Sequence, residues 1–279
     1  MHERYWELNG SPFQGTADLQ WFWESPAYDE AVARLLFVVE QRRRFGLLLG
    51  PAGTGKTLVL KAARRDAERL GRSVTAVDLF GLDSHQLLWQ LAIALRLGPR
   101  DGCSRWWLWQ AICDHLQALH SAHVPAVLFL DHLERADADC LEVLERLLHL
   151  DAANDSCLAI LAAARDNFDE QVFPELTELS EFRIELPLCD RRETEQFVTS
   201  LLHKAGSQRQ IFTPGAFDLL YEISQGVPRT IVRLCDIALA AGAHQELLHI
   251  DGETLLAVVG ELPSSPHRRA ESLALSGVL

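Results

Sequence analysis

An eight-residue segment, Gly50-Pro-Ala-Gly-Thr-Gly-Lys56-Thr57, constrains the fold more than any other part of this sequence. It fits the pattern G-x-x-x-x-G-K-[ST], whose glycines let backbone N–H groups curve around phosphate oxygens without Cβ clashes. The apolar run 45–49 before it is typical of a buried strand, and residues 58–70 after it are typical of an amphipathic helix. Strand, loop and helix in this order predict a phosphate site, because a helix N-terminus favours anions. The alternative is a glycine-rich turn that only precedes a helix.

This loop pattern assigns a task to each of its fixed side chains. We expect Lys56 to reach the β- and γ-phosphates of a nucleoside triphosphate and the hydroxyl of Thr57 to ligate Mg²⁺. The residues predicted to bind the nucleotide are Gly50, Pro51, Ala52, Gly53, Thr54, Gly55, Lys56, Thr57 and Leu58.

Composition restricts the remaining possibilities. The chain has 279 residues, 48% hydrophobic and 23% charged, which is ordinary for a globular protein with one large or two smaller domains. A formal net charge of −13 disfavours a nonspecific grip on DNA or an anionic membrane. We find no apolar run of membrane-spanning length and no signal-peptide core at the N-terminus. Six cysteines without a C-x-x-C pair predict reduced thiols, so we expect a cytoplasmic protein.

Apolar and β-branched runs alternate with helical patterns through the first two thirds of the chain. Further strands are predicted over 73–79, 124–130, 157–162 and 182–186. Helices are predicted over 26–41, 84–97, 104–120 and 138–150. Alternation of this kind favours an α/β fold, a P-loop NTPase αβα sandwich in which helices cover both faces of a parallel sheet. Such sheets bind ligands at the carboxyl ends of their strands.

From residue 190 onward the pattern is entirely helical, which predicts a small all-helical lid domain. Helices are expected over 190–205, 215–225, 227–243 and 251–261. The domains that we predict are an aromatic N-terminal segment packed on the nucleotide-binding core (1–25), the P-loop nucleotide-binding domain (26–187), the lid (188–262) and a flexible tail (263–279).

A second phosphate-site signal ends the predicted strand 124–130, where four apolar residues precede Asp131. This is the Walker B pattern, whose carboxylate holds the Mg²⁺ that bridges the β- and γ-phosphates. An ATPase of this type usually has Glu at the next position to activate the attacking water, but this chain has His132. A neutral imidazole accepts a hydrogen bond from water without the fixed charge of a carboxylate. Glu134 takes over if the loop turns it inward, and otherwise lies on the surface. We therefore expect binding, with slow hydrolysis.

Three arginines complete the list of candidates. Arg165 follows the predicted strand 157–162, which lies beside the P-loop strand in a sheet of this kind. There it serves either as a phosphate sensor or as an ordinary surface residue. Arg229, in the first turn of a predicted lid helix, is placed to reach the γ-phosphate from the lid, with a salt bridge as the alternative. Arg183 is a weaker candidate for an arginine finger that acts across a subunit boundary.

Two further clusters have no assigned task. His115, His120 and His123 lie near one another, but their spacing matches no zinc motif. The segment Trp106-Trp-Leu-Trp109 cannot place all its rings on one side of a helix, so some of them are expected to pack in the core and others to contact a partner.

Taken together, these motifs resemble the AAA+ ATPases of the ExeA/GspA (general secretion pathway protein A) group, which are relatives of the TniB-type transposition ATPases. The similarity covers most of residues 5–260. Besides the P-loop and Walker B segments, it rests on Tyr5-Trp-Glu-Leu-Asn-Gly-Ser-Pro-Phe13, Glu30-Ala-Val-Ala-Arg-Leu35, Leu186-Pro-Leu-Cys-Asp-Arg-Arg-Glu-Thr-Glu-Gln-Phe197 and Gly226-Val-Pro-Arg-Thr-Ile-Val-Arg-Leu-Cys-Asp236. The last of these is the most specific, since it resembles the family's sensor 2 helix and places Arg229 at the sensor position.

The resemblance implies ATP and Mg²⁺ bound between the αβα domain and the lid, often at subunit boundaries, with nucleotide state driving assembly or remodelling of a partner. It also implies a protein partner or a homo-oligomer. His132 departs from the family pattern and leaves two readings of turnover, a slow ATPase and a nucleotide-gated switch. The family's membrane span and peptidoglycan-binding region are not in this sequence, so we expect the likeness to cover the ATPase module alone. A DNA-associated regulator of the transposition or initiator kind is a third reading, which rests on kinship and Arg42-Arg-Arg44 and is opposed by the net charge.

Overall fold

The computed structural model describes residues 2–15, 18–150, 158–166 and 182–261 and divides the chain into two compact units. The first unit comprises Met1–Trp23, Gly53–Gly55 and Leu188–Leu279, and the second comprises Glu24–Ala52 and Lys56–Pro187. The predicted tail, 263–279, lies outside the described residues, as does residue 157 of the predicted strand 157–162.

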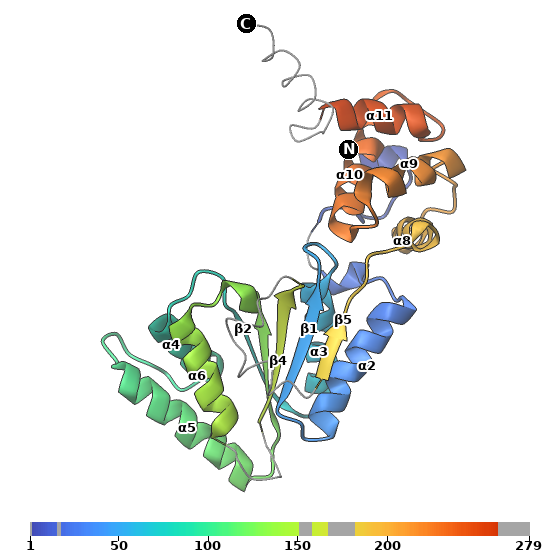
Figure 1. The fold of residues 1–279 in the computed structure, drawn as a ribbon. Helices are drawn as coiled ribbons and strands as arrows, with labels where there is room; N and C mark the ends of the chain where they lie inside the picture. Colours follow the sequence, from blue (N-terminus) through green and yellow to red (C-terminus); the bar gives the residue numbers. More distant parts are fainter. Residues whose placement is uncertain (1, 16–17, 151–157, 167–181, 262–279) are drawn as a thin grey trace, which may run out of the picture. The chain divides into compact units, whose positions relative to one another are not determined.

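A five-stranded parallel sheet forms the centre of the second unit, with the strand order β2-β3-β4-β1-β5 (Figure 1). The strands are β1 (Phe45–Gly50), β2 (Ser73–Asp78), β3 (Ala126–Asp131), β4 (Leu158–Arg165) and β5 (Phe182–Glu185). Two parallel strands must be joined by a long crossover connection, because the chain has to return to the starting edge of the sheet. Such a connection is long enough to contain a helix. The strand after the Walker B segment, β4, lies beside the P-loop strand β1, as the sequence predicted.

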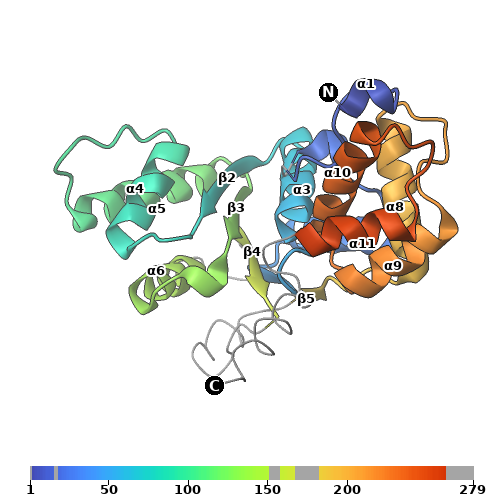
Figure 2. The same cartoon turned by 90° about the horizontal axis from the view of Figure 1, so that it is seen from above.

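Helices cover both faces of this sheet, which confirms the predicted αβα sandwich. They are α2 (Pro26–Glu40), α3 (Lys56–Arg69), α4 (Ser84–Ala94), α5 (Arg105–Ser121) and α6 (Ala138–His149). Figure 2 shows α4, α5 and α6 on one side of the strands and α3 on the other. The second face is close-packed, since a Cβ added to Gly46 of β1 would lie only 3.1 Å from the side chain of Val38 in α2.

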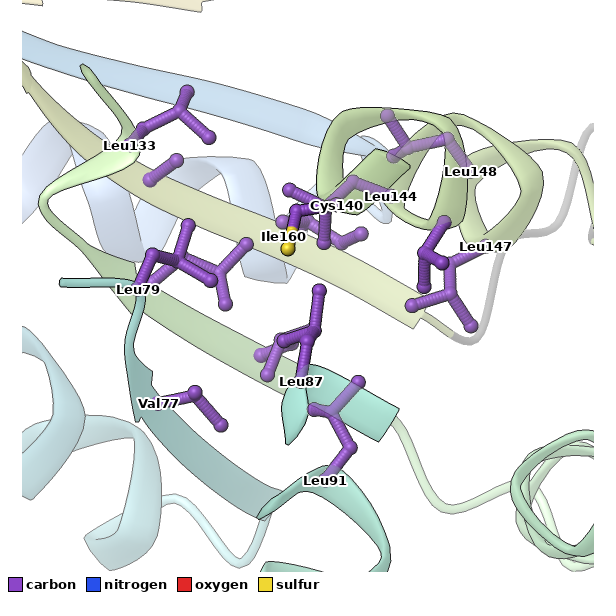
Figure 3. Packing of buried hydrophobic residues seen from close by; sticks show 14 of the residues in the cluster. Val77, Leu79, Leu87, Leu91, Leu133, Cys140, Leu144, Leu147, Leu148 and Ile160 are labelled. Carbon is purple, nitrogen blue, oxygen red and sulfur yellow. The ribbon is translucent and has the colours of Figure 1, made fainter. Parts of the chain in front are cut away.

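The face toward α4, α5 and α6 contains the large hydrophobic core of this unit (Figure 3). Alternate residues of the strands, such as Leu47 and Ile160, face leucines of α4 and α6 there. The core also includes Leu133, from the 3₁₀ helix η2 (Leu133–Arg135) that directly follows β3. Fully burying a leucine side chain stabilises a fold by about 1.5–3 kcal/mol. Leu133 therefore anchors a short segment of the chain. The two candidate catalytic residues His132 and Glu134 lie on either side of Leu133 in that segment.

The first unit is helical among its described residues. It contains α1 (His2–Tyr5), η1 (Leu19–Trp21), α8 (Arg191–Lys204), α9 (Pro214–Ser224), α10 (Pro228–His244) and α11 (Gly252–Glu261). Helix α8 begins with a capping box in which Asp190 and Glu193 satisfy each other's backbone N–H groups. Helix α9 begins at an N-cap, since Oγ1 of Thr213 accepts from the N–H of Ala216.

The aromatic N-terminal segment belongs to the helical unit, and its packing on the nucleotide-binding core stays a prediction. The indole N–H of Trp6 donates to the carbonyl of Leu239 in α10 at 2.8 Å, and the hydroxyl of Tyr5 donates to the carbonyl of Leu247 at 2.8 Å. The ring of Trp23 packs at a tilt against the ring of Phe197 in α8. Composition predicted that these rings would be buried, but hydrophobic burial is not directional, so it did not predict which surface would cover them.

The five cysteines among the described residues are free thiols, and Cys140, Cys189 and Cys235 are buried. Burial raises the pKa of Cys140 and of Cys189 to about 12, which keeps both thiols protonated and unreactive at neutral pH. Across the same described part of the chain, no helix has both the length and the apolar character needed to cross a membrane.

Candidate nucleotide site

The P-loop joins β1 to α3, and its conformation depends on glycine. Gly53 and Gly55 have φ values of 89° and 90°, a left-handed region that side chains disfavour. Nζ of Lys56, the first residue of α3, donates to the carbonyl oxygens of Gly50 at 2.6 Å and Pro51 at 2.9 Å. These contacts hold the ammonium group over the loop that leads to the helix N-terminus.

Lys56 lies in an acidic environment as well as a partly buried one. Burial lowers the pKa of the Lys56 ammonium, and the carboxylates of Glu134, Asp131 and Asp166 act against that shift. Among these three acids, Glu134 has the largest effect. The Lys56 ammonium therefore has carboxylates near it. A site for a Mg²⁺-bound phosphate chain would need both, since the ammonium contacts phosphate oxygens and a carboxylate contacts the metal.

Asp131 and Thr57 meet directly. The hydroxyl of Thr57 donates to Oδ2 of Asp131 at 2.6 Å, which joins the first turn of α3 to the last residue of β3. A hydroxyl and a carboxylate side by side are the protein ligands that Mg²⁺ uses when phosphate oxygens and water complete its octahedron. Among the described residues, no group of three His, Cys, Asp or Glu side chains could hold a metal ion.

His132 adopts a left-handed conformation, with φ of 57° and ψ of 43°. Its backbone N–H donates to Oδ1 of Asp131 at 2.9 Å, and its ring Nδ1 lies 2.8 Å from Oδ1 of Asp78. Asp78 ends β2 and is the register partner of Asp131. The same Oδ1 of Asp78 accepts from the N–H of Phe80, whose ring lies 6.1 Å from the imidazole. The imidazole is thus paired with the end of the edge strand.

Glu134 points inward. Its side chain is 11% exposed, and Oε1 lies 3.1 Å from Nε of Arg165. The other oxygen, Oε2, is buried and has no hydrogen-bond donor among the residues that the structure describes. A buried carboxylate oxygen without a donor is costly, and one beside a phosphate site is placed to accept a proton from water. The left-handed turn at His132 and the buried Leu133 together bring Glu134 to this position.

Arg165 is the last residue of β4 and the register partner of Gly50, the first residue of the P-loop. Its guanidinium is partly exposed and paired with Glu134. The structure therefore brings Arg165 together with Lys56, Asp131 and Glu134 at the carboxyl ends of β1, β3 and β4. Both interpretations of Arg165, a phosphate sensor and a surface residue, stay predictions.

The remaining candidates lie elsewhere in the chain. Leu58 is in the first turn of α3. Arg229 is in the first turn of α10, after Pro228, and its side chain is exposed. Arg183 lies on β5, where its Nε is 3.5 Å from Oε1 of Glu185.

Asp78 is a site residue that sequence reasoning missed. The predicted strand 73–79 includes it, but no task was assigned to it. A usable signal was present, because Asp78 and Asp131 both lie at the carboxyl ends of predicted strands, and parallel strands bring such ends to one edge of the sheet.

The comparisons with known proteins agree with this geometry. The family model of the AAA domain matches residues 39–172. General secretion pathway protein A of Aeromonas hydrophila is 28% identical over 268 residues, which cover 90% of this chain and 47% of that protein. This chain therefore spans about half the length of that relative.

Solved structures with the same fold include proteins of low sequence identity. ORC1 of Aeropyrum pernix, solved in complex with DNA, is 18% identical with a TM-score of 0.67, covering 85% of this chain and 66% of that one. CDC6P of Pyrobaculum aerophilum is 16% identical with a TM-score of 0.70, over 85% and 68% of the two chains. The RuvB Holliday junction branch migration motor of Thermotoga maritima is 16% identical with a TM-score of 0.58, over 89% and 72%. With its P-loop and its strand order, the chain has a P-loop NTPase αβα fold, matches the AAA domain over residues 39–172 and is similar to general secretion pathway protein A.

Proposed function

We propose that this protein binds ATP with Mg²⁺ and hydrolyses it slowly, and that its nucleotide state controls the assembly or remodelling of a protein partner. The observation that carries the proposal is the contact of Thr57 with Asp131 at 2.6 Å, beside the Lys56 ammonium. It joins the two motifs that a Mg²⁺–nucleotide site requires, although they are far apart in the sequence.

Each side chain has a distinct task in this proposal. Lys56 exchanges its loop carbonyl partners for phosphate oxygens, while Thr57 and Asp131 hold the metal. Bound Mg²⁺ supplies positive charge that offsets the charge on the phosphates. Glu134 accepts a proton from the attacking water, whose oxygen bonds to the γ-phosphorus as the bond to the β–γ bridging oxygen breaks. Arg165 positions Glu134, and Arg229 senses the γ-phosphate from the lid, as the family pattern implies.

The test of the enzyme proposal is phosphate release at saturating ATP, with Lys56→Ala as the blank. Loss of a charged hydrogen-bond donor to phosphate is expected to weaken ATP binding by about 10- to 100-fold. Lys61→Ala, a matched change of an exposed lysine in the same helix, is expected to leave both binding and release unchanged. Equal phosphate release by wild type and Lys56→Ala, under several conditions and with candidate partners present, would defeat the proposal.

A nucleotide-gated switch with negligible hydrolysis is the second candidate, and His132 favours it. The residue after Asp131 is an imidazole paired with Asp78, where an acid usually activates water. This candidate predicts that wild type binds ATP and returns it intact, and that His132→Glu raises turnover by about 10-fold or more. Chromatographic separation of ATP from ADP after prolonged incubation decides the matter, since rapid turnover by wild type rules the switch out.

The partner and the location belong to the same proposal. Sizing the protein with and without ATP, with product analysis of the same samples, separates a homo-oligomer from a monomer that acts on another protein. The free thiols fit a reducing compartment, and we propose a cytoplasmic location. ORC1 of Aeropyrum pernix was solved with DNA, but the net charge of −13 argues against a DNA grip here. A salt-titrated DNA-binding assay with ATP present tests that alternative.

A further inference from the structure

Two tryptophan side chains in the first turn of α5, Trp106 and Trp107, are exposed to solvent. Trp106 is 69% exposed and Trp107 is 39% exposed. The helix is held on its unit by Leu108 and Ile112, which are fully buried, and at about 100° per residue Trp106 points away from that packed side. The fold therefore does not need the indole of Trp106 for packing. Large apolar groups that are exposed side by side are candidates for an interaction site.

Three arginines accompany these tryptophans in the sequence. Arg96 follows α4, Arg100 lies in the connector between α4 and α5, and Arg105 begins α5. All three are exposed, and none makes an ion pair within the part of the chain that the structure describes. By contrast, two other exposed arginines of the same unit are paired, Arg34 with Glu30 at 2.5 Å and Arg64 with Glu68 at 2.9 Å. The cationic groups near α5 are thus available to a partner.

The connector that presents these side chains is ordered by its own contacts. The N–H of Cys103 donates to the carbonyl of Arg100 at 3.0 Å, and the N–H of Arg100 donates to Sγ of Cys103 at 3.3 Å. Leu97 and Cys103 also pack against the core of the unit. A surface that is already rigid loses less conformational entropy when a partner binds.

The location separates this surface from the nucleotide site. Figure 1 shows α4 and α5 at the side of the second unit where the edge strand β2 lies. The last residue of β2, Asp78, belongs to the candidate site, but among the described residues no hydrogen bond or ion pair joins the first turn of α5 to Lys56, Asp131 or Glu134. Substitutions in the first turn of α5 can therefore be tested without altering Lys56 or its surroundings.

We propose that Trp106, Trp107, Arg96, Arg100 and Arg105, the tryptophan–arginine surface, bind an acidic segment of a partner protein that also presents apolar side chains. Charge complementarity selects the partner: the unpaired guanidinium groups match carboxylates in a bidentate geometry, and the indoles match apolar groups between them. Tryptophan and arginine are the side chains most enriched where protein interfaces concentrate their binding energy. Single-stranded nucleic acid, which offers phosphates to cations and bases to aromatic rings, is the alternative that the experiment tests.

The experiment measures fluorescence anisotropy of a short labelled helical peptide built from Leu and Glu, added to the full chain. We expect this peptide to bind at least about tenfold more tightly than the same peptide with Lys in place of Glu. Trp106→Ala and Arg105→Glu are each expected to weaken binding about tenfold. Arg34→Glu, a matched charge change on α2, is expected to change it less than about twofold.

Several outcomes would overturn this proposal. They are equal affinity for the two peptides, full retention of binding by Trp106→Ala, and tighter binding of single-stranded oligothymidylate, which indicates a nucleic-acid surface. Sedimentation that shows self-association lost in Trp106→Ala would assign the surface to a second copy of the chain instead. The proposal does not depend on ATP hydrolysis: these variants are expected to keep wild-type turnover and thermal stability, so failure here and failure of the Lys56→Ala test are separate results.

Discussion

Replacing Glu134 by glutamine is expected to lower ATP hydrolysis by about 10²- to 10⁴-fold and to leave ATP affinity nearly unchanged. Glutamine has nearly the shape of glutamate and still accepts a hydrogen bond from Arg165, but it cannot take a proton from water. The buried Oε2 of Glu134, with no donor in the described part of the chain, is the atom from which this expectation follows. Single-turnover hydrolysis with radiolabelled ATP separates the chemical step from nucleotide binding.

The matched control for Glu134→Gln is His132→Ala. The imidazole of His132 is paired with Asp78, so its removal is expected to change hydrolysis by less than about tenfold. The reverse result, in which His132→Ala loses turnover and Glu134→Gln keeps it, would identify the imidazole as the base. In that case Asp78→Asn should reproduce the His132→Ala defect, because Asp78 orients the ring.

The second large effect is expected in the helical unit, where Gly226→Ala should lower the free energy of unfolding by about 3–5 kcal/mol. Gly226 has a φ of 70°, and a Cβ there would lie 1.9 Å from the carbonyl oxygen of Cys189. The two backbones are already joined, since the N–H of Cys189 donates to the carbonyl of Gly226 at 3.0 Å. Neither segment can move apart without losing that hydrogen bond.

Gly215→Ala is the control for the change at Gly226, because a Cβ at Gly215 meets no atom within 4 Å and the residue lies inside α9. There the substitution is expected to stabilise the protein slightly, by up to about 1 kcal/mol. Urea unfolding followed by far-ultraviolet circular dichroism compares the two variants. If the free energy of unfolding of Gly226→Ala lies within about 1 kcal/mol of the wild-type value, the close approach to Cys189 does not explain why this position is glycine.

Local patterns predicted much of this architecture because their physics is local. Helices α8 and α9 begin within one residue of the predicted starts at 190 and 215, since the caps Asp190 and Thr213 depend on residues only a few positions apart. The P-loop glycines were recognised for a similar reason: their left-handed φ values are a property of the loop itself. The helical pattern after residue 190 predicted the lid, and the resemblance to one family then placed Arg229 at a sensor position as a further expectation.

The sequence by itself determined that this chain has a P-loop, a parallel sheet with β4 beside β1, and a carboxylate at the end of β3. Only the tertiary structure decided which surface covers Trp6, and that Glu134 turns inward while His132 pairs with Asp78. These outcomes depend on contacts between residues far apart in the chain, such as Glu134 with Arg165. The energies of those contacts come from burial and charge pairing in the assembled fold, and no short segment of sequence contains them.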